Sequence, residues 1–438
     1  MDKIFKDKKI VVMGLGLHGG GISVAKFFCR QGAKVLVTDI KAESQLQDSL
    51  KKLKGFKIEY VLGRHREEDF SAADLIVKNP DVSNDSPYLR IAAENNVPIE
   101  TDLSLFFNFS KAFIIGVTGT KGKSTTSSLI FHFLKYKYKR IFLAGNIGIS
   151  PLEIITKIKK DDMVVLELSS FGLENLKQSP NIAVITNLLP DHLNRYASMS
   201  EYANTKKMIF KYQDADDCLL LNKDDGIVRE FSKDAKSKVY FYSKDEIPAG
   251  IETKKFRLFG NHNLANLSAA ISVAKILGVS TGSINKSIKS FKGVPARQEF
   301  VKEANGVKYF NDTTATMPDA VVAAIESFSQ TFLDSKLVFI CGGQDKGLDF
   351  SELAEEIRGK SVSLVLLPGT ASDKLRQELG DYKKIENVLS MEEAVSCAQK
   401  MSDRGDVVVL SPGAASFNLF KNEFDRGDRF VEFVKKIK

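Results

Sequence analysis

The chain is poor in the features that mark disulfide-stabilised, zinc-binding or membrane-spanning proteins. It has four cysteines in 438 residues (Cys29, Cys218, Cys341 and Cys397), and none of them has CxxC spacing. This scatter argues against a disulfide framework or a zinc site and fits a reducing compartment. No apolar run reaches the roughly 18 residues that a membrane-spanning helix needs. Residues 1–10 carry charges without a hydrophobic segment, so we expect no signal peptide and a soluble, cytoplasmic protein.

Low-complexity segments and short-period repeats are also lacking. With 43% apolar and 27% charged residues, this excludes a disordered chain, a collagen-like repeat and a coiled-coil rod. Since a domain takes about 100 to 200 residues, we expect two or three domains with cores of ordinary size. The net charge of +8 suits either a nucleic-acid-binding protein or an enzyme with anionic substrates. The lysines are spread along the chain, so charge alone does not separate these classes.

Apolar runs and glycine turns predict three α/β domains in series, at residues 1–110, 111–293 and 294–438. The runs are continuous rather than alternating, which is typical of parallel strands that are buried on both faces. The expected strands are residues 10–13, 34–39, 74–77, 112–117, 163–167, 182–186, 217–221, 337–340, 364–367 and 407–410.

The first glycine motif, Gly14-x-Gly16-x-x-Gly19, follows an expected strand, and Asp39 ends the next one. Backbone amides of such a turn can bind a diphosphate together with the N-terminus of the following helix. A carboxylate placed like Asp39 can accept hydrogen bonds from hydroxyl groups. NAD-linked oxidoreductases and proteins that bind a UDP-linked sugar both need this arrangement. The motif therefore indicates a diphosphate and leaves its carrier open.

The second motif, GVTGTKGKSTT at residues 116–126, lies between an expected strand and a helical pattern. Its GKST tail is that of a phosphate-binding loop, although Val117 stands where the strict pattern has glycine. The loop amides would hold phosphate oxygens, and Lys123 would reach the β- and γ-phosphates. Ser124 or Thr125 would ligate magnesium. The sequence therefore predicts a nucleoside-triphosphate site.

Two segments with acidic or imidazole side chains follow strands of the same predicted sheet. Glu167 ends the strand MVVLE, and Asp191-His192 follows the strand AVITN. Parallel strands present their carboxyl ends at one edge, where ligands bind in open α/β sheets. Carboxylate, imidazole and phosphate oxygens suit Mg²⁺ or Mn²⁺, which would bridge the β- and γ-phosphates. A purely structural role for His192 is the alternative.

Further motifs accompany these in a fixed order: AGNIG (144–148), LELSSF (166–171), NLLPDHLNRY (187–196), GNHNLANLSAA (260–270), NDTTAT (311–316), CGGQDKG (341–347) and LSPGAASFNLFKNEFDRGDRF (410–430). Together with GVTGTKGKSTT they resemble the Mur ligases over nearly the whole chain, and the last block resembles the branch that adds D-glutamate. The resemblance implies a Rossmann-like first domain that binds a UDP-linked substrate. It also implies a central P-loop ATPase-type domain and a Rossmann-like third domain that binds the incoming amino acid.

The resemblance implies an ATP-dependent ligase that joins D-glutamate to UDP-N-acetylmuramoyl-L-alanine in cytoplasmic synthesis of cell-wall precursors. The alanyl carboxylate would attack the γ-phosphate, and the amine of D-glutamate would then attack the acyl phosphate. Two Mg²⁺ ions, for which Mn²⁺ could substitute, would neutralise the crowded anions. The resemblance also implies a monomer without nucleic-acid or membrane partners.

By motif position, the resemblance assigns the site residues. The catalytic positions are Lys123, Glu167, His192 and Lys206, with Lys206 carbamylated, and the metal ligands are Ser124, Glu167, His192 and Lys206. The ATP-binding positions are Gly119, Thr120, Lys121, Gly122, Lys123, Ser124, Thr125, Asn263, Asn266, Arg297 and Asp312. The UDP-substrate positions are Leu17, His18, Asp39, Asn146 and Ser169, and the amino-acid positions are Thr316, Lys346 and Ser416. Without the resemblance, Lys206 would be interpreted as an ordinary lysine on a helix surface.

The chain departs from the family pattern in two regions. Thr314 stands where the family usually has lysine, Met317 where asparagine is common, and Glu423 where an aromatic residue is expected. Asp81 ends an NPD segment in place of the usual SPG. A related ligase with another acceptor, such as L-glutamate, is therefore the alternative. An NAD(P)-dependent dehydrogenase would leave the GKST motif unexplained, and a nucleic-acid-binding protein would need clustered charge.

Overall fold

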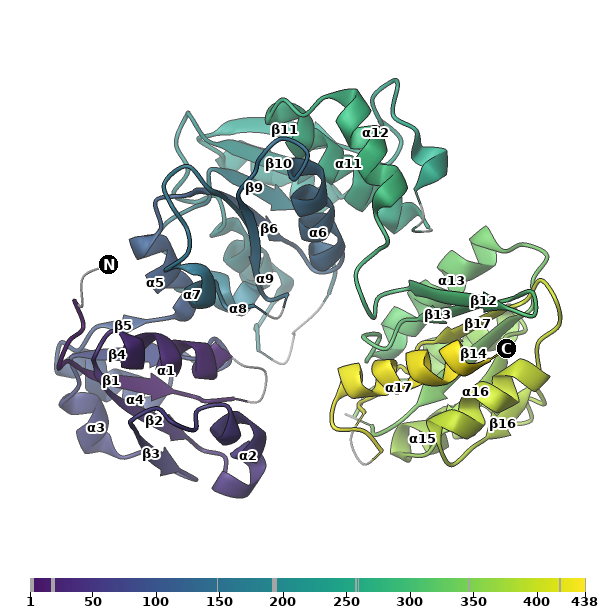
Figure 1. The fold of residues 1–438 in the computed structure, drawn as a ribbon, viewed down its shortest axis with the longest axis horizontal. Coiled ribbons are helices and arrows are strands. Elements are labelled where there is room, and N and C mark those ends of the chain that lie inside the picture. Colours follow the sequence, from purple (N-terminus) through teal and green to yellow (C-terminus); the bar gives the residue numbers. More distant parts are fainter. Residues whose placement is uncertain are drawn as a thin grey trace. The chain divides into compact units, whose positions relative to one another are not determined.

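The computed structural model describes residues 4–16, 20–147, 149–190, 195–256, 258, 260–345, 347–416 and 419–437. Strands and helices alternate along the chain and form three sheets (Figure 1). The first two sheets lie in one compact unit (Met1–Ile251 and Ala265–Ile284), and the third lies in a second unit (Glu252–Leu264 and Asn285–Lys438). No helix in the described ranges is both long and apolar enough to cross a membrane. The predicted α/β class and the three sheets are confirmed, and the exact domain limits stay a prediction.

The first sheet is parallel and has the strand order β3-β2-β1-β4-β5. Its elements are β1 (Lys9–Met13), α1 (Gly20–Arg30), β2 (Lys34–Asp39), α2 (Glu43–Lys51), β3 (Ile58–Leu62), α3 (Glu67–Ser71), β4 (Leu75–Lys78), α4 (Pro87–Glu94), β5 (Ile99–Glu100) and α5 (Asp102–Phe109). Ile10 and Val12 of β1 pack in one core with α1, whereas Val11 and Met13 pack in another with α3 and α4. Successive residues of a strand face opposite sides, so a strand covered on both sides is apolar throughout.

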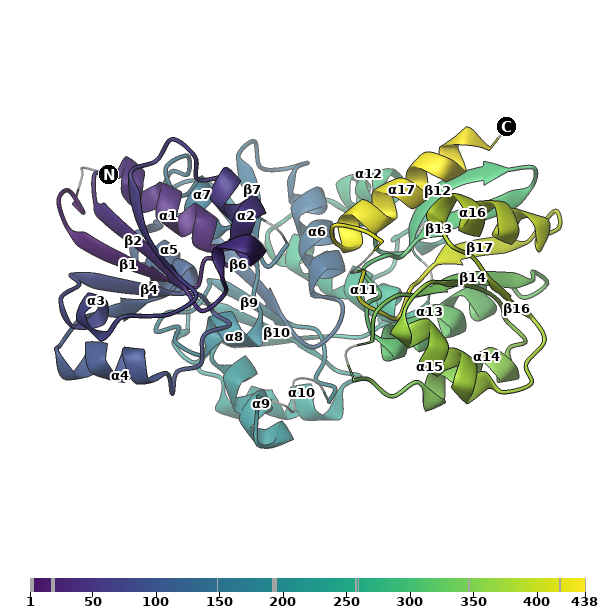
Figure 2. The ribbon, with the colours of Figure 1, turned by 90° about the horizontal axis from the view of Figure 1, so that it is seen from below.

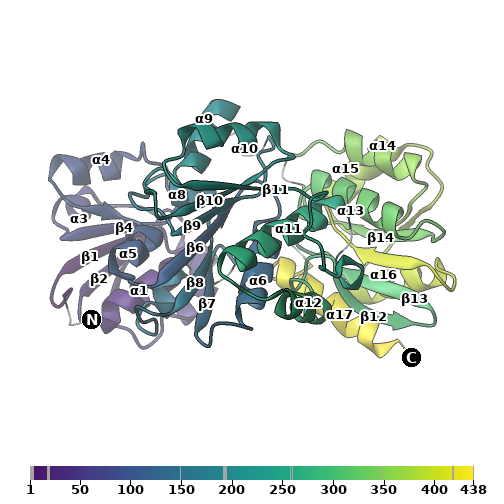
Figure 3. The same ribbon diagram turned by 90° about the horizontal axis from the view of Figure 1, so that it is seen from above.

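The second sheet has the order β11-β10-β9-β6-β8-β7, and all its pairs are parallel. Its elements are β6 (Phe113–Thr118), α6 (Lys123–Leu134), β7 (Ile141–Gly145), α7 (Pro151–Ile154), β8 (Met163–Glu167), α8 (Ser170–Leu173), β9 (Ile182–Ile185), α9 (Met199–Lys207), β10 (Cys218–Asn222), α10 (Gly226–Glu230) and β11 (Lys238–Tyr242), followed by α11 (Asn261–Ile276) and α12 (Thr281–Ser290). Figure 3 shows β6 between β8 and β9. The chain order reverses at β6, and ligands bind outside the carboxyl ends of strands at such a switch point.

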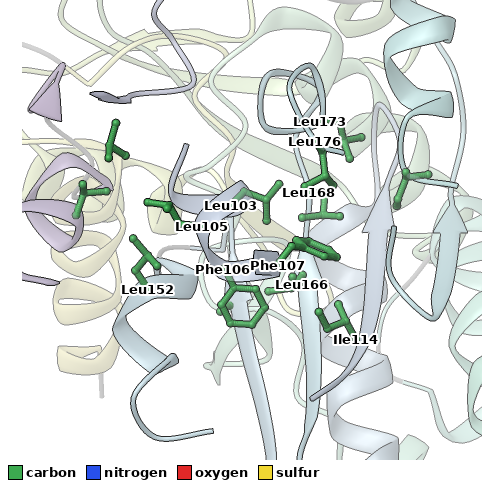
Figure 4. Close-up of a cluster of buried hydrophobic side chains, with 14 of the residues drawn as sticks. Leu103, Leu105, Phe106, Phe107, Ile114, Leu152, Leu166, Leu168, Leu173 and Leu176 are labelled. Atoms are coloured by element: carbon green, nitrogen blue, oxygen red, sulfur yellow. The ribbon is translucent and has the colours of Figure 1, made fainter. Parts of the chain in front are cut away.

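A shared hydrophobic core joins the first two sheets. In Figure 4, Leu103, Phe106 and Phe107 of α5 lie beside Ile114 of β6 and Leu166 of β8. All five side chains are almost fully buried, and burying one such side chain contributes about 1.5–3 kcal/mol. The same core continues into the residues that pack between α1 and the first sheet. The two sheets therefore form one compact unit.

The third sheet has the order β12-β13-β17-β14-β15-β16, with β12 and β13 antiparallel and the other pairs parallel. Its elements are β12 (Glu299–Ala304), β13 (Val307–Asn311), α13 (Pro318–Thr331), β14 (Leu337–Gly342), α14 (Ser351–Gly359), β15 (Ser363–Leu367), α15 (Thr370–Leu379), β16 (Ile385–Asn387), α16 (Met391–Lys400), β17 (Val407–Leu410) and α17 (Glu423–Lys436). Figure 2 shows α13, α14 and α15 on one face, and α16 and α17 on the other. Both faces are covered, as in the first sheet.

Candidate active site

The turn between β6 and α6 depends on two glycines that allow other segments to approach it closely. Gly119 has φ +143°, and a Cβ built there would collide with Thr186 Oγ1 just beyond β9. Gly122 has φ +84°, and a Cβ there would collide with Asn266 Oδ1 of α11. The Thr186 hydroxyl also donates to the carbonyl oxygen of Lys121 (2.6 Å). Only glycine fits these two positions, so no side chain covers the backbone of the turn at the N-terminus of α6.

Lys123 is the first residue of α6, and its side chain folds back over the turn. Its Nζ donates to the carbonyl oxygens of Gly119 (3.0 Å) and Thr120 (2.8 Å). Ser124, the next residue, is buried at the same helix end. The first amides of a helix have no intrahelical acceptor, so this end places backbone N–H groups beside an ammonium group. The arrangement suits a phosphate.

Glu167 is buried at the end of β8, beside the phosphate-binding turn. The β6–β8 register places it opposite Val117, and its side chain is 2% exposed. Its Oε2 atom has no hydrogen-bond partner among the described residues. A buried carboxylate oxygen without a partner costs free energy, so the position fits a bound cation. Among the residues that the structure describes, no three His, Cys, Asp or Glu side chains form a cluster, and Asp191 and His192 lie outside the described residues.

Lys206 reaches the phosphate-binding turn from α9. It is 1% exposed, and its Nζ donates to the carbonyl oxygen of Gly119 (3.0 Å) and to Thr118 Oγ1 (3.3 Å). The same atom lies 5.1 Å from the centroid of the Tyr202 ring. An interpretation of Lys206 as a surface lysine, which the helical pattern alone suggests, is therefore wrong. The side chain is buried because it extends from α9 to Thr118 and Gly119 at the end of β6.

The two asparagines of α11 are both buried, Asn263 at 4% and Asn266 at 5% exposure. Asn266 Oδ1 accepts a hydrogen bond from Thr126 Oγ1 of α6 (3.1 Å). Because Asn266 also lies against Gly122, it belongs to the surroundings of the phosphate-binding turn.

The first glycine turn is fixed by Asp39. Gly14 and Gly16 have φ values of +88° and +64°. The amide of Gly16 donates to Asp39 Oδ2 (3.1 Å), and the amide of Lys41 donates to Oδ1 (2.9 Å). A Cβ on Gly21 would lie 2.6 Å from the carbonyl oxygen of Gly14, so a glycine there lets α1 approach the turn. Leu17, His18 and Gly19 lie outside the described residues.

Asn146 and Ser169 follow β7 and β8 at the edge that also carries Glu167. The amide of Asn146 donates to the carbonyl oxygen of Glu167 (2.9 Å), and its side chain is exposed. Ser169 precedes α8, and its Oγ accepts from the amide of Gly172 (3.1 Å). The structure thus brings together these two residues, the phosphate-binding turn, Glu167 and Lys206.

The second unit has a buried acid at the end of β13. Asp312 is 7% exposed and accepts hydrogen bonds from the amide of Gln298 (3.1 Å) and the hydroxyl of Ser411 (3.0 Å). Burial raises the pKa of Asp312 to about 7, and these bonds and the charge of the exposed Arg297 offset only part of that effect. The carboxyl group therefore keeps its proton to a much higher pH than an ordinary aspartate does.

Arg426 is a buried cation of the second unit to which the sequence motifs assign no role, although it stands in the RGDRF block. It is 0% exposed and donates to the carbonyl oxygens of Ala414 (3.0 Å) and Thr313 (2.9 Å). Burial lowers the pKa of Arg426 to about 10. The side chain ties together the segments that carry Thr316 and Ser416. Lys346 lies outside the described residues.

Three protein-family models match successive parts of the chain. They are the Mur ligase MurD-like N-terminal domain (residues 8–101), the Mur ligase middle domain (residues 117–274) and the Mur ligase glutamate ligase domain (residues 296–413).

Similar proteins match over their full lengths. The UDP-N-acetylmuramoylalanine–D-glutamate ligase of Roseiflexus sp. (strain RS-1) is 39% identical and covers 98% of this chain and 99% of that protein. The enzyme of the same name from Borreliella afzelii (strain PKo) is 37% identical, with coverages of 100% and 99%. The crystal structure of UDP-N-acetylmuramate-alanine ligase from Thermotoga maritima shares the fold, with a TM-score of 0.61 at 22% identity and coverages of 98% and 100%. The chain therefore belongs to the Mur ligase family.

Proposed function

We propose that this Mur ligase joins D-glutamate to UDP-N-acetylmuramoyl-L-alanine in the synthesis of peptidoglycan precursors, with cleavage of ATP to ADP and phosphate. The family uses ATP, and the full-length relatives are named for this reaction. The observation that carries the proposal is the meeting of Lys123, Glu167 and Lys206, from α6, β8 and α9, at the phosphate-binding turn.

The reaction requires that a carboxylate become reactive toward an amine. Transfer of the γ-phosphate to the alanyl carboxylate gives an acyl phosphate and ADP. The amine of D-glutamate then attacks the carbonyl carbon, and the C–O bond breaks with release of phosphate. Lys123 and the first amides of α6 would stabilise the negative charge on the transferred group, since preformed donors need no reorganisation during the reaction.

We assign the magnesium ligands to Ser124, Glu167 and His192, with the modified Lys206 as a further ligand. The buried, unpartnered Oε2 of Glu167 supports this donor set. When bound, magnesium or manganese would neutralise phosphate charge. Glu167 is fixed by the pairing of β8, so it would hold such an ion without rearrangement of the chain.

The burial of Lys206 supports its carbamylation. Its amine would attack carbon dioxide and lose a proton, which turns a cation into an anion. Keeping an ammonium group buried is costly, whereas an anion beside bound cations is stabilised. The hydrogen bond from its Nζ to the carbonyl oxygen of Gly119 supports a role for this side chain beside the turn.

The remaining assignments are proposals that rest on motif position. The nucleotide would contact Gly119, Thr120, Lys121, Gly122, Thr125, Asn263, Asn266, Arg297 and Asp312. The UDP-linked substrate would contact Leu17, His18, Asp39, Asn146 and Ser169, and the amino acid would contact Thr316, Lys346 and Ser416.

A different acceptor amino acid is the second candidate. Thr314 donates its hydroxyl to the carbonyl oxygen of Ala296 (2.9 Å) and supplies no positive charge where the family usually has lysine. Glu423 begins α17 where an aromatic residue is expected, and Phe424 beside it is 55% exposed. These positions favour a test with L-glutamate and other acceptors.

A phosphate-release assay with a panel of amino acids tests the proposal. Release should require ATP, UDP-N-acetylmuramoyl-L-alanine and D-glutamate together. Release that needs neither substrate would refute the ligase activity, and release with another amino acid in place of D-glutamate would establish the second candidate.

A further inference from the structure

Arg195 makes a set of contacts that the proposed chemistry does not use. Its Nε and Nη2 donate to the two carboxylate oxygens of Glu174 (3.2 and 2.9 Å), at the end of α8. Its Nη1 and Nη2 donate to the carbonyl oxygens of Asp81 and Pro80 (both 3.2 Å), in the loop after β4. The guanidinium carbon lies 4.2 Å from the centroid of the Phe171 ring. One planar side chain thus joins a loop of the first sheet to elements of the second.

The loop that Arg195 holds packs directly on the first glycine turn. The Asn79 side chain donates to the carbonyl oxygen of Gly14 (3.4 Å). A Cβ built on Gly14 would lie 2.9 Å from the Cβ of Asn79, so the two segments are in close contact. A displacement of the loop would therefore displace the turn that we expect to bind the diphosphate.

Arg195 is also close in sequence to a proposed metal ligand. Arg195 directly follows residues 191–194, which include the proposed ligand His192. The next residue, Tyr196, is 4% exposed and donates its hydroxyl to Glu174 Oε1 (2.9 Å). Glu174 thus anchors two consecutive side chains immediately after that segment.

We infer that Arg195 is a positioning residue. It fixes the loop after β4, which packs on the first glycine turn, relative to α8, which directly follows the strand that ends in Glu167, and so presents the alanyl carboxylate to the γ-phosphate. This inference rests on the proposed function. It predicts that Arg195 acts on the rate of the chemical step more than on the binding of ATP, because its contacts lie outside the phosphate-binding turn. A misplacement of reacting groups by about 1 Å can lower a rate about 10²-fold.

An arginine suits this position because of its shape. Its planar fork matches a carboxylate with two parallel bonds and can still donate to two carbonyl oxygens, whereas a lysine ammonium is a single point of charge. The side chains of Arg195 and Glu174 are only 22% and 12% exposed, so water does not compete freely for these bonds. Arg195→Lys therefore keeps the charge and removes the geometry.

The chain offers a matched control within the same unit. Arg140 also donates to both carboxylate oxygens of an acid, Asp162 (2.7 and 2.8 Å), and to a carbonyl oxygen, that of Lys157 (2.7 Å). Arg140 and Asp162 directly precede β7 and β8, so they lie at the edge of the second sheet opposite to the site. Arg140→Lys makes the same chemical change away from the proposed function.

The test compares steady-state kinetics of the full chain with Arg195→Lys, Glu174→Gln and Arg140→Lys. We expect Arg195→Lys to lower kcat about 10²-fold with the KM for ATP within about twofold of the original. Glu174→Gln should lower kcat in the same manner, and the double variant should lose little more than Arg195→Lys, because both changes break one network. Arg140→Lys should leave kcat within about twofold.

Hydrogen exchange of residues 79–86 supplies a readout without turnover. Arg195→Lys should speed exchange there at least about tenfold, because the loop loses two hydrogen bonds, and Arg140→Lys should not. A kcat for Arg195→Lys within about twofold of the original, an equal loss in Arg140→Lys, or unchanged exchange of the loop would overturn the inference. Failure of the unaltered protein to use the proposed substrates would refute the proposed function alone, since the exchange measurement still tests the role of Arg195.

Discussion

Replacing Asp312 by asparagine is expected to stabilise the second unit by an amount that grows with pH. The carboxyl group is buried, and its two hydrogen bonds come from the amide of Gln298 and the hydroxyl of Ser411. An asparagine side chain has the same shape and can satisfy both groups, with its oxygen accepting from Gln298 and its nitrogen donating to the Ser411 oxygen. The substitution thus removes the cost of a buried negative charge and little else.

The size of the effect follows from the raised pKa of Asp312. Because the pKa is about 7 in the folded chain and 3.8 for an ordinary aspartate, the folded form holds the proton more tightly. Protonated Asp312 therefore makes its full contribution to the free energy of unfolding below pH 3.8. This contribution is lost as the pH rises to about 7. The loss amounts to about 4 kcal/mol, of which about 3 kcal/mol falls above pH 5. With a urea dependence of about 2 kcal/mol/M, 4 kcal/mol shifts the midpoint of unfolding by about 2 M.

Labelling of Cys341 in a urea series isolates the unfolding of the second unit. Cys341 lies in β14 and is 0% exposed, so it reacts with a thiol reagent only when this unit opens, and peptide mass spectrometry separates it from the other cysteines. The midpoint for Asp312→Asn should exceed that of the unaltered chain by about 2 M at pH 8.5 and by much less at pH 5. Asp428→Asn, at an exposed position of α17, serves as the control and should change neither midpoint. An equal difference at both pH values would refute the reasoning.

Three further changes test the phosphate-binding turn. Glu167→Gln should lower kcat about 10²-fold or more and weaken Mn²⁺ binding measured by electron paramagnetic resonance, because the buried Oε2, which has no hydrogen-bond partner among the described residues, would bind the ion; unchanged Mn²⁺ binding would contradict this. Lys206→Ala should abolish activity without rescue by bicarbonate, and near-normal turnover would exclude the carbamate. Gly122→Ala should weaken binding of an ATP analogue about tenfold, since φ is +84° and the new methyl group meets Asn266, whereas Gly282→Ala, where nothing lies within 4 Å, should leave binding unchanged.

The strands that the sequence predicts are those in the interiors of the sheets. β1, β6, β8 and β17 are buried on both faces and lie between two other strands, so each contains a continuous apolar run. The edge strands of all three sheets (β3, β5, β7, β11, β12 and β16) escape prediction, as does the interior strand β13. An edge strand is short or partly exposed, as in the KVYFY sequence of β11, and its pairing depends on a neighbour that its own residues do not specify.

The candidate site was predictable where a motif follows a strand. Gly119 and Glu167 stand at strand ends, and Gly122 lies in the turn that follows β6. Parallel strands bring such positions to one edge whatever the intervening sequence is. The burial of Lys206 and of Arg426 was not predictable from local pattern. Each side chain contacts a segment that is far away in the sequence. Lys206 donates to the carbonyl oxygen of Gly119, and Arg426 donates to that of Thr313. Such contacts produce no periodic pattern in the neighbouring residues.

The packing of α5 against the second sheet limits how the chain can be divided experimentally. A fragment that ends near residue 110 would keep Leu103, Phe106 and Phe107 but lose Ile114 and Leu166, the side chains that cover them. Such a fragment would expose an apolar surface to water and would therefore self-associate. Binding of a diphosphate to the first glycine turn is therefore best measured on the intact chain, with a substitution that abolishes binding at the phosphate-binding turn.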